Sequence, residues 1–209
     1  MKHLELLIER YPALAVCESE IKRAIEAIIA CYEKGGKLLL CGNGGSCADC
    51  DHIVGELCKG FLNMRTLTED QRARMKKNAP TLSEETLDRL QQGLPAISLS
   101  SFSALNTAFS NDVAPELIYA QGVLALGRPD DCLLAISTSG NSKNVLEASR
   151  VARGLGLTVI ALTGEGGGRL ADLANICIRV PARETYQVQE LHLPVYHALC
   201  ASLEKHFFE

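Results

Sequence analysis

Five short apolar runs, separated by segments with helical periodicity, constrain the fold of this chain more than any other feature. The runs lie at residues 38–41, 96–100, 132–137, 157–163 and 176–181. Short, continuously apolar runs are typical of strands that are buried on both faces of a parallel sheet. The helical segments between them are typical of crossovers that cover those faces. The sequence therefore predicts an α/β fold of three layers, flavodoxin-like, with a five-stranded parallel sheet and helices on both faces.

The domain organisation follows from the length and from one segment of different character. A chain of 209 residues is expected to form a single domain over residues 1–209. Residues 61–94 are charged and polar, with weak helical patterning from Ser83 to Gln92, so we expect a partly helical insertion on the surface. A long helix is expected from Glu184 to Phe207, with a kink at Pro194 because proline removes a backbone donor.

Charge and cysteine content exclude several classes of partner. The net charge of −4 gives no general attraction for nucleic acid or for an anionic membrane. No apolar run approaches the roughly 20 residues that span a bilayer, and the N-terminus lacks the apolar core of a signal peptide. The nine cysteines are predicted to be reduced thiols, which indicates a cytoplasmic location. The CxxC pair Cys47 and Cys50 is interpreted as packed side chains, because no second CxxC completes a zinc site.

Two turns rich in glycine and hydroxyl groups directly follow predicted strands. Gly42-Asn43-Gly44-Gly45-Ser46 follows the first, and Ser46 is expected to cap the next helix. The second turn, residues 137–142, carries the hydroxyls of Ser137, Thr138, Ser139 and Ser142. Ligands of parallel sheets collect at such turns, where helix N-termini present free N–H groups. Neither turn matches a Walker motif, so the pattern favours a monophosphate ligand over a nucleotide, and ordinary capped turns are the alternative.

Polar side chains on two predicted helices are candidates for proton transfer. His52 and Glu56 are four residues apart and share one helix face. Gln189, His192 and His197 interrupt the apolar pattern of the C-terminal helix. A His–Glu pair on a helix can ligate a metal or transfer a proton, but it can equally form a surface ion pair. The glycine turn that precedes His52 and Glu56 favours a site, because it brings them toward the carboxyl edge of the sheet.

Four blocks of the sequence together resemble the signature blocks of phosphoheptose isomerases, which are enzymes built on a sugar-isomerase (SIS) domain. The blocks are CGNGGSCADCDHIVGEL at 41–57, SND at 110–112, AISTSGNSKNVLEA at 135–148 and VQELHLPVYHAL at 188–199. The resemblance extends over nearly the whole chain outside 61–94. It implies conversion of sedoheptulose 7-phosphate to D-glycero-D-manno-heptose 7-phosphate through an enediol, by an acid and a base.

The same resemblance implies roles for individual residues. Glu56 and His197 would be the acid/base pair. One zinc ion per active site would be held by His52, Glu56, Gln189 and His197. The sugar phosphate would be bound by Asn43, Gly44, Gly45, Asn111, Asp112, Ser137, Thr138, Ser139, Ser142 and Gln189. The resemblance also implies a homotetramer with active sites at subunit interfaces.

Two other functions stay open at this point. One is a non-catalytic SIS protein that binds a protein partner such as a replication initiator, and the other is a module that senses sugar phosphates without turnover. The polar residues on two helices favour catalysis, because a binding scaffold has no need of them. Cys47, Cys50, Tyr186 and Pro194 depart from the residues usual in the family, and these departures bear on substrate specificity.

Overall fold

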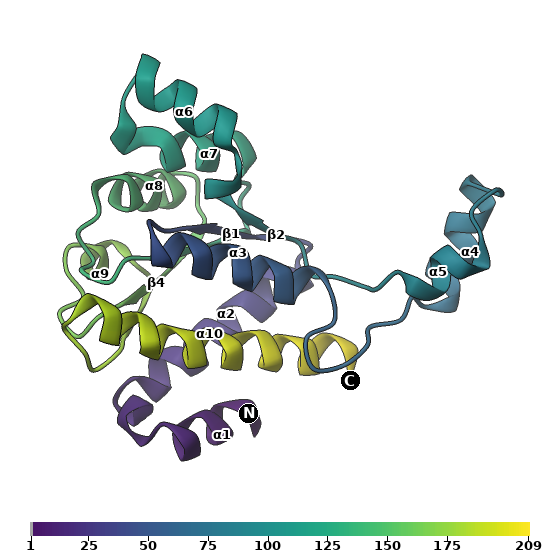
Figure 1. Ribbon diagram of the computed structural model, residues 1–209, viewed down its shortest axis with the longest axis horizontal. Helices are drawn as coiled ribbons and strands as arrows, with labels where there is room; N and C mark the ends of the chain where they lie inside the picture. The colour runs from purple at the N-terminus through teal and green to yellow at the C-terminus, as the bar shows by residue number, and fades with distance from the viewer. Residues whose placement is uncertain (1) are drawn as a thin grey trace.

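The structure is a computed structural model that describes residues 2–209, and its centre is a parallel sheet of five strands between two layers of helices (Figure 1). The strand order is β2-β1-β3-β4-β5, and every neighbouring pair is parallel. This order is that of flavodoxin-like sheets, so the predicted fold class is confirmed. The strands are β1 (Leu38–Cys41), β2 (Ala96–Ser98), β3 (Cys132–Ile136), β4 (Thr158–Thr163) and β5 (Ile176–Arg179).

Alternate side chains of each strand enter two separate cores, one on each face of the sheet. Leu38 and Leu40 of β1 pack into the first core, and Leu39 and Cys41 into the second. The first core is covered by α1 (Lys2–Arg10), η1 (Pro12–Cys17), α2 (Glu18–Glu33), α3 (Gly45–Cys58) and α10 (Thr185–Phe208). The second is covered by η2 (Leu99–Ser101), α7 (Ile118–Leu126), α8 (Lys143–Gly154) and α9 (Leu170–Leu173).

The structure differs from the sequence-based expectations at two helix positions. Helix α6 (Ser103–Asp112), which packs on η3 (Pro115–Leu117) and α7, was not predicted. It buries no residue, so no apolar stripe marks it in the sequence. The expectation that Ser46 caps α3 is wrong, because the helix begins at Gly45 and Gly44 is its N-cap. Gly44 has a φ of 55°, a conformation that glycine adopts without strain.

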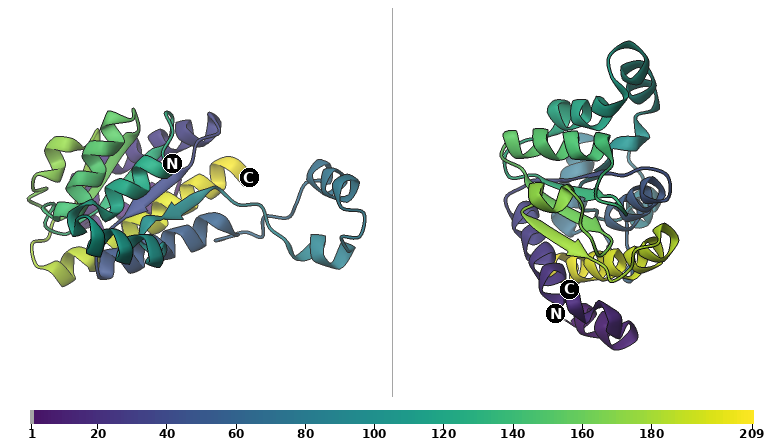
Figure 2. Two further views of the ribbon diagram at one scale, coloured as in Figure 1. Left: turned by 90° about the horizontal axis from the view of Figure 1, so that it is seen from above. Right: turned by 90° about the vertical axis from the view of Figure 1, so that its left-hand side faces the viewer.

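Residues 61–94 form an arm that extends away from the sheet and its helices (Figure 2). The arm carries α4 (Glu69–Asn78) and α5 (Glu84–Arg89), which are joined by ion pairs from Arg72 to Glu84 and to Asp88, both 2.7 Å. The two ends of the arm meet in an antiparallel bridge between Thr66 and Gln91. Most residues of the arm are exposed, and two short helices make up much of it.

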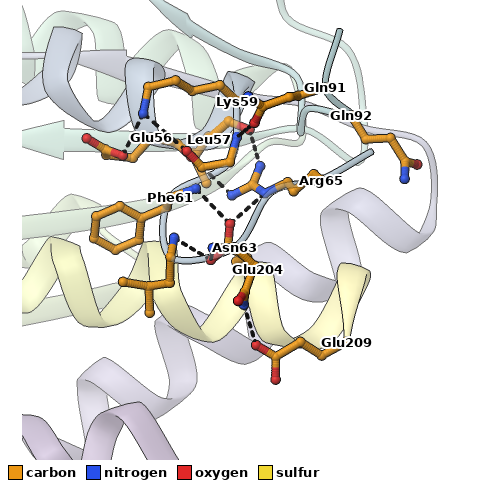
Figure 3. Close-up of polar contacts among 12 residues, drawn as sticks. Glu56, Leu57, Lys59, Phe61, Asn63, Arg65, Gln91, Gln92, Glu204 and Glu209 are labelled. Atoms are coloured by element: carbon orange, nitrogen blue, oxygen red, sulfur yellow. Dashed lines mark hydrogen bonds and ion pairs between the residues drawn. The ribbon is translucent and has the colours of Figure 1, made fainter. Parts of the chain in front are cut away.

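A buried ion pair anchors the base of the arm to α10 (Figure 3). Arg65 Nε donates to Glu204 Oε1 at 2.8 Å, and the two side chains are 0% and 1% exposed. Glu204 also accepts hydrogen bonds from the backbone N–H groups of Phe61 and Leu62 at 2.8 and 2.7 Å. Burial alone would raise the pKa of Glu204, but these hydrogen bonds and the bond from Arg65 lower it. The chain that leaves α3 is thus fixed to the helix that carries His197.

The helices and the cysteines have two further properties. Within residues 2–209, no helix combines the length and the apolar character that crossing a membrane requires. All nine cysteines are free thiols. Cys50 is buried on α3 and Cys47 is half-buried, in line with packed side chains.

Candidate active site

The two glycine- and hydroxyl-rich turns lie next to each other at the carboxyl edge of the sheet. They follow β1 and β3, which are neighbours paired from Leu38↔Cys132 to Cys41↔Ala135. In a flavodoxin-like strand order this is the point where the chain changes direction across the sheet, and ligand crevices form there. Asn144, at the start of α8, joins the turns, because its amide and the amide of Asn43 exchange two hydrogen bonds of 2.8 and 2.9 Å. Asn144 was not identified from the sequence.

The second turn is held in shape by the glycine-rich segment 164–168. Gly140 has a φ of 65°, and the backbones of Gly167 and Gly168 lie so close that a side chain at position 140 would collide with them. Leu170 N–H donates to the Gly140 carbonyl at 2.9 Å. Ser137 Oγ and Ser142 Oγ lie 3.0 Å apart. Thr138 and Ser139 line a cavity of about 380 Å³, so this turn presents hydroxyl groups to an open space.

The candidate acid/base residues come together where α3 packs against α10. His52 Nε2 lies 3.3 Å from Glu56 Oε1, and the ring of His197 lies 5.1 Å from the ring of His52, centre to centre. Lys59 Nζ contacts the other Glu56 oxygen at 3.2 Å, as drawn in Figure 3. His52, Glu56 and His197 are called the imidazole–carboxylate cluster below. Within one chain, Glu56 and His197 therefore both lie next to His52.

One ring nitrogen of His197 is enclosed by the protein. Its Nε2 atom is buried and, among residues 2–209, has no hydrogen-bond partner. Burial, followed by the charge of His52, lowers the pKa of His197, and Glu56 opposes that shift. The imidazole is therefore neutral at neutral pH, with one nitrogen free to hold or release a proton.

A tyrosine that was not identified from the sequence supports the cluster. Tyr196 Oη donates to Asp49 Oδ1 at 3.1 Å and lies 3.0 Å from His52 Nδ1. Burial raises the pKa of Tyr196, so its hydroxyl stays protonated at neutral pH. Burial also raises the pKa of Asp49, and the hydrogen bond from Tyr196 lowers it. These contacts run between α3 and α10, and no local sequence pattern reports such a contact.

Gln189 lies apart from the imidazole–carboxylate cluster. Its amide sits against Gly45 in the first turn of α3. It is eight residues before His197, which places it about 12 Å away along the axis of α10. In this structure Gln189 therefore belongs to the glycine turn.

Asn111 and Asp112 are exposed at the end of α6, where Asn111 Nδ2 donates to Asp112 Oδ1 at 2.8 Å. Within residues 2–209, neither forms a hydrogen bond to the two turns.

The residues assigned to zinc fit that ion in chemical type. Two imidazoles and one carboxylate are common zinc ligands, and the buried His197 Nε2 has no partner in the part of the chain that the structure describes. Across residues 2–209, no three His, Cys, Asp or Glu side chains are already spaced as a metal site. Of the four residues predicted as ligands, His52, Glu56 and His197 lie together and Gln189 does not.

An apolar cavity of about 260 Å³ opens beside His197. It is bounded by α1, α10 and the start of the arm, and Phe61 packs on the His197 ring at 5.5 Å. Three leucines of its lining are exposed: Leu6 (41%), Leu62 (57%) and Leu193 (41%). Adjacent exposed leucines are typical of a surface that another molecule covers.

Comparison with known proteins places this geometry in a family. The family models for the SIS domain match residues 79–203 and residues 12–98. The phosphoheptose isomerase of Rhodospirillum rubrum is 39% identical over 191 residues, which are 91% of this chain and 88% of that protein. The phosphoheptose isomerase of Helicobacter pylori is 36% identical over 207 residues, 99% of this chain and 93% of that protein.

Solved structures show the same likeness. The phosphoheptose isomerase from Francisella tularensis has a TM-score of 0.77 and 33% identity, with 98% of this chain and 95% of that chain covered. The enzyme from Neisseria gonorrhoeae has a TM-score of 0.75 and 31% identity, with 98% and 96% covered. The likeness thus extends over both turns, the imidazole–carboxylate cluster and the helices that carry them.

Proposed function

Because this chain belongs to the phosphoheptose isomerase family of SIS-domain proteins, and is thus a sugar-phosphate isomerase of heptose biosynthesis, we propose that it converts sedoheptulose 7-phosphate to D-glycero-D-manno-heptose 7-phosphate. The observation that carries the assignment of the chemistry is the convergence of Glu56 and His197 on His52. The relatives carry the name phosphoheptose isomerase, which supports a heptose phosphate as the substrate.

The reaction moves a proton between adjacent carbons through an enediol, and it needs a base and an acid. The Glu56 carboxylate takes the proton from the carbon next to the carbonyl group. His197, neutral and with a free buried nitrogen, exchanges a proton with the carbonyl oxygen. The hydroxyls of Ser137, Thr138, Ser139 and Ser142 bind the phosphate, and Asn43, Gly44, Gly45, Asn111, Asp112 and Gln189 bind the sugar.

Zinc is the proposed cofactor, one ion per active site. His52, Glu56 and His197 would hold it, whereas Gln189, beside Gly45, serves the sugar. When bound, zinc supplies Lewis acidity that stabilises the negative charge developing on the substrate oxygen. Dialysis against a chelator should remove the metal and lower turnover, and zinc content measured by mass spectrometry should return with activity. Full activity of demonstrably zinc-free protein would exclude an obligatory ion.

The proposed assembly is a homotetramer with active sites at subunit interfaces. It is supported by the three exposed leucines around the cavity next to His197. The proposed location is the cytoplasm, which the nine free thiols support. Light scattering of the purified protein would measure the subunit number.

The decisive experiment is the Glu56→Gln variant. It should lower kcat by about 10²- to 10⁴-fold, because a positioned general base typically contributes that much. Exchange of substrate hydrogen with deuterium from solvent should fall in parallel. Glu33→Gln is the matched control, because Glu33 also pairs with a histidine, His206, at 3.0 Å but on the exposed surface. Wild-type turnover by Glu56→Gln would remove Glu56 from the mechanism.

A further inference from the structure

Asp49, Tyr196 and His52 form a continuous chain of hydrogen bonds that ends at the imidazole–carboxylate cluster. Asp49 and His52 come from consecutive turns of α3, and Tyr196 reaches them from α10. The Tyr196 hydroxyl lies 3.1 Å from Asp49 Oδ1 and 3.0 Å from His52 Nδ1. The other nitrogen of the same ring, Nε2, lies 3.3 Å from Glu56 Oε1. Each ring nitrogen of His52 therefore has one defined neighbour.

The chemistry of the three groups fixes the direction of these hydrogen bonds. An ionised carboxylate only accepts, so the single hydroxyl proton of Tyr196 points to Asp49. The hydroxyl oxygen can then only accept from His52, which requires a proton on Nδ1. A neutral imidazole carries one proton, so its lone pair is on Nε2, the nitrogen that faces Glu56.

We propose that Asp49 and Tyr196 are positioning residues that hold His52 as the Nδ1–H tautomer and so keep a lone pair on Nε2 at the catalytic carboxylate. The proposal rests on the proposed function for its catalytic meaning, but the tautomer itself is a property of the protein alone. A carboxylate or carbonyl oxygen that accepts from the other ring nitrogen commonly fixes the tautomer of a functional histidine. Here a tyrosine relays the effect, because Asp49 does not reach the ring directly.

The consequence concerns the space between His52 and Glu56. With the lone pair on Nε2, two acceptor atoms face each other at 3.3 Å. Such a pair repels unless a proton or a cation lies between them. The relay thus keeps this position ready for a positive charge, whether a proton in transit or a bound metal ion. The opposite tautomer would fill the position with the histidine's own N–H.

The test is ¹⁵N NMR of metal-free protein labelled at histidine, recorded at pH 8. The His52 signals are assigned by their loss in His52→Gln. The wild type should show His52 protonated at Nδ1. Tyr196→Phe should lose this preference, and its kcat should fall about 10- to 100-fold with KM within about twofold. Tyr32→Phe is the control, because the Tyr32 hydroxyl is also buried but has no partner among residues 2–209.

Asp49→Ala provides a second variant with a sharper outcome. Without the carboxylate, the Tyr196 proton can turn to His52 Nδ1, so the tautomer should reverse to Nε2–H. This reading keeps the proposal testable if Tyr196→Phe fails to fold. An unchanged His52 tautomer in a folded variant, or an Nε2–H tautomer in the wild type, overturns the relay. These spectra do not depend on turnover, so full activity of Glu56→Gln would refute the proposed function separately.

Discussion

The amide of Gln189 lies so close to the backbone of Gly45 that a side chain at position 45 would have to displace it. The contact joins the first turn of α3 to the first turns of α10. The three atoms nearest to a methyl group at position 45 all belong to the flexible end of Gln189, which can move aside. Alanine is favoured over glycine by about 1 kcal/mol within a helix. Replacement of Gly45 by alanine should therefore stabilise the fold but impair the site.

We predict that Gly45→Ala keeps or raises the free energy of unfolding while it lowers kcat/KM for the sugar phosphate by about tenfold, the loss of one or two hydrogen bonds. Urea denaturation and steady-state kinetics measure the two quantities. Gln189→Ala should give a similar loss, and the double variant should lose no more than either, because both act through one contact. Additive losses would show that Gly45 acts on the substrate independently of Gln189.

The paired amides of Asn43 and Asn144 lead to a second prediction. Asn144→Ala removes both hydrogen bonds between the first turn and α8. The turns should lose their fixed spacing, so KM should rise several-fold while kcat changes less. Inorganic phosphate, measured as a competitive inhibitor, should bind more weakly by a similar factor. Unchanged inhibition by phosphate would show that the turns keep their spacing without Asn144.

The anchor of the arm gives a stability prediction. Arg65→Met leaves the buried Glu204 without its charged partner, and breaking such a pair costs about 3–5 kcal/mol. Arg72→Met is the matched control, because its ion pairs to Glu84 and Asp88 involve exposed carboxylates and should contribute far less to stability. Urea midpoints at constant slope measure both losses. Equal losses would contradict the role of Arg65 as the anchor.

The burial of His192 leads us to predict that the protein loses stability in acid. Burial lowers its pKa to about 4, and the nearby backbone of Thr163 opposes the shift without a hydrogen bond of normal geometry. The unfolded chain binds the proton more readily, so stability falls as the pH drops from about 6.5 to about 4 and levels off below. The contribution is about 3 kcal/mol. Wild type should lose that much more than His192→Leu across this range, whereas His206→Gln, on the surface, should behave like wild type.

Much of the fold was predictable because the apolar composition of each strand indicates that the strand is buried. The runs LLLC and CLLAI are apolar at every position, as strands covered on both faces must be. The two turns could be placed at one edge because parallel strands bring their carboxyl ends together. Helix α6 could not be found this way, since it buries no residue. The start of α4 could have been, because Thr68 and Gln71 form a capping box whose residue spacing is visible in the sequence.

Only part of the candidate site could be predicted, because the sequence shows local neighbours but not long-range contacts. His52 and Glu56 are local neighbours, so helix periodicity alone pairs them. Tyr196 and Asn144 gain their roles from contacts with residues more than 100 positions away in the chain, at Asp49 and Asn43. Such contacts depend on how whole elements pack. The separation of Gln189 from His197 likewise became visible only when α10 lay alongside α3.

The bridge between Thr66 and Gln91 means that the chain leaves the sheet-and-helix body and returns to it at a single point. The bridge closes the loop between these two residues, so the length of the loop can vary at little cost. Doubling the length of a flexible loop costs only about 0.6 kcal/mol. The segment 66–91 is therefore a suitable site for insertions. Foreign peptides, tags or whole small domains grafted there should leave the enzyme folded, and relatives can diverge in this segment without redesigning their cores.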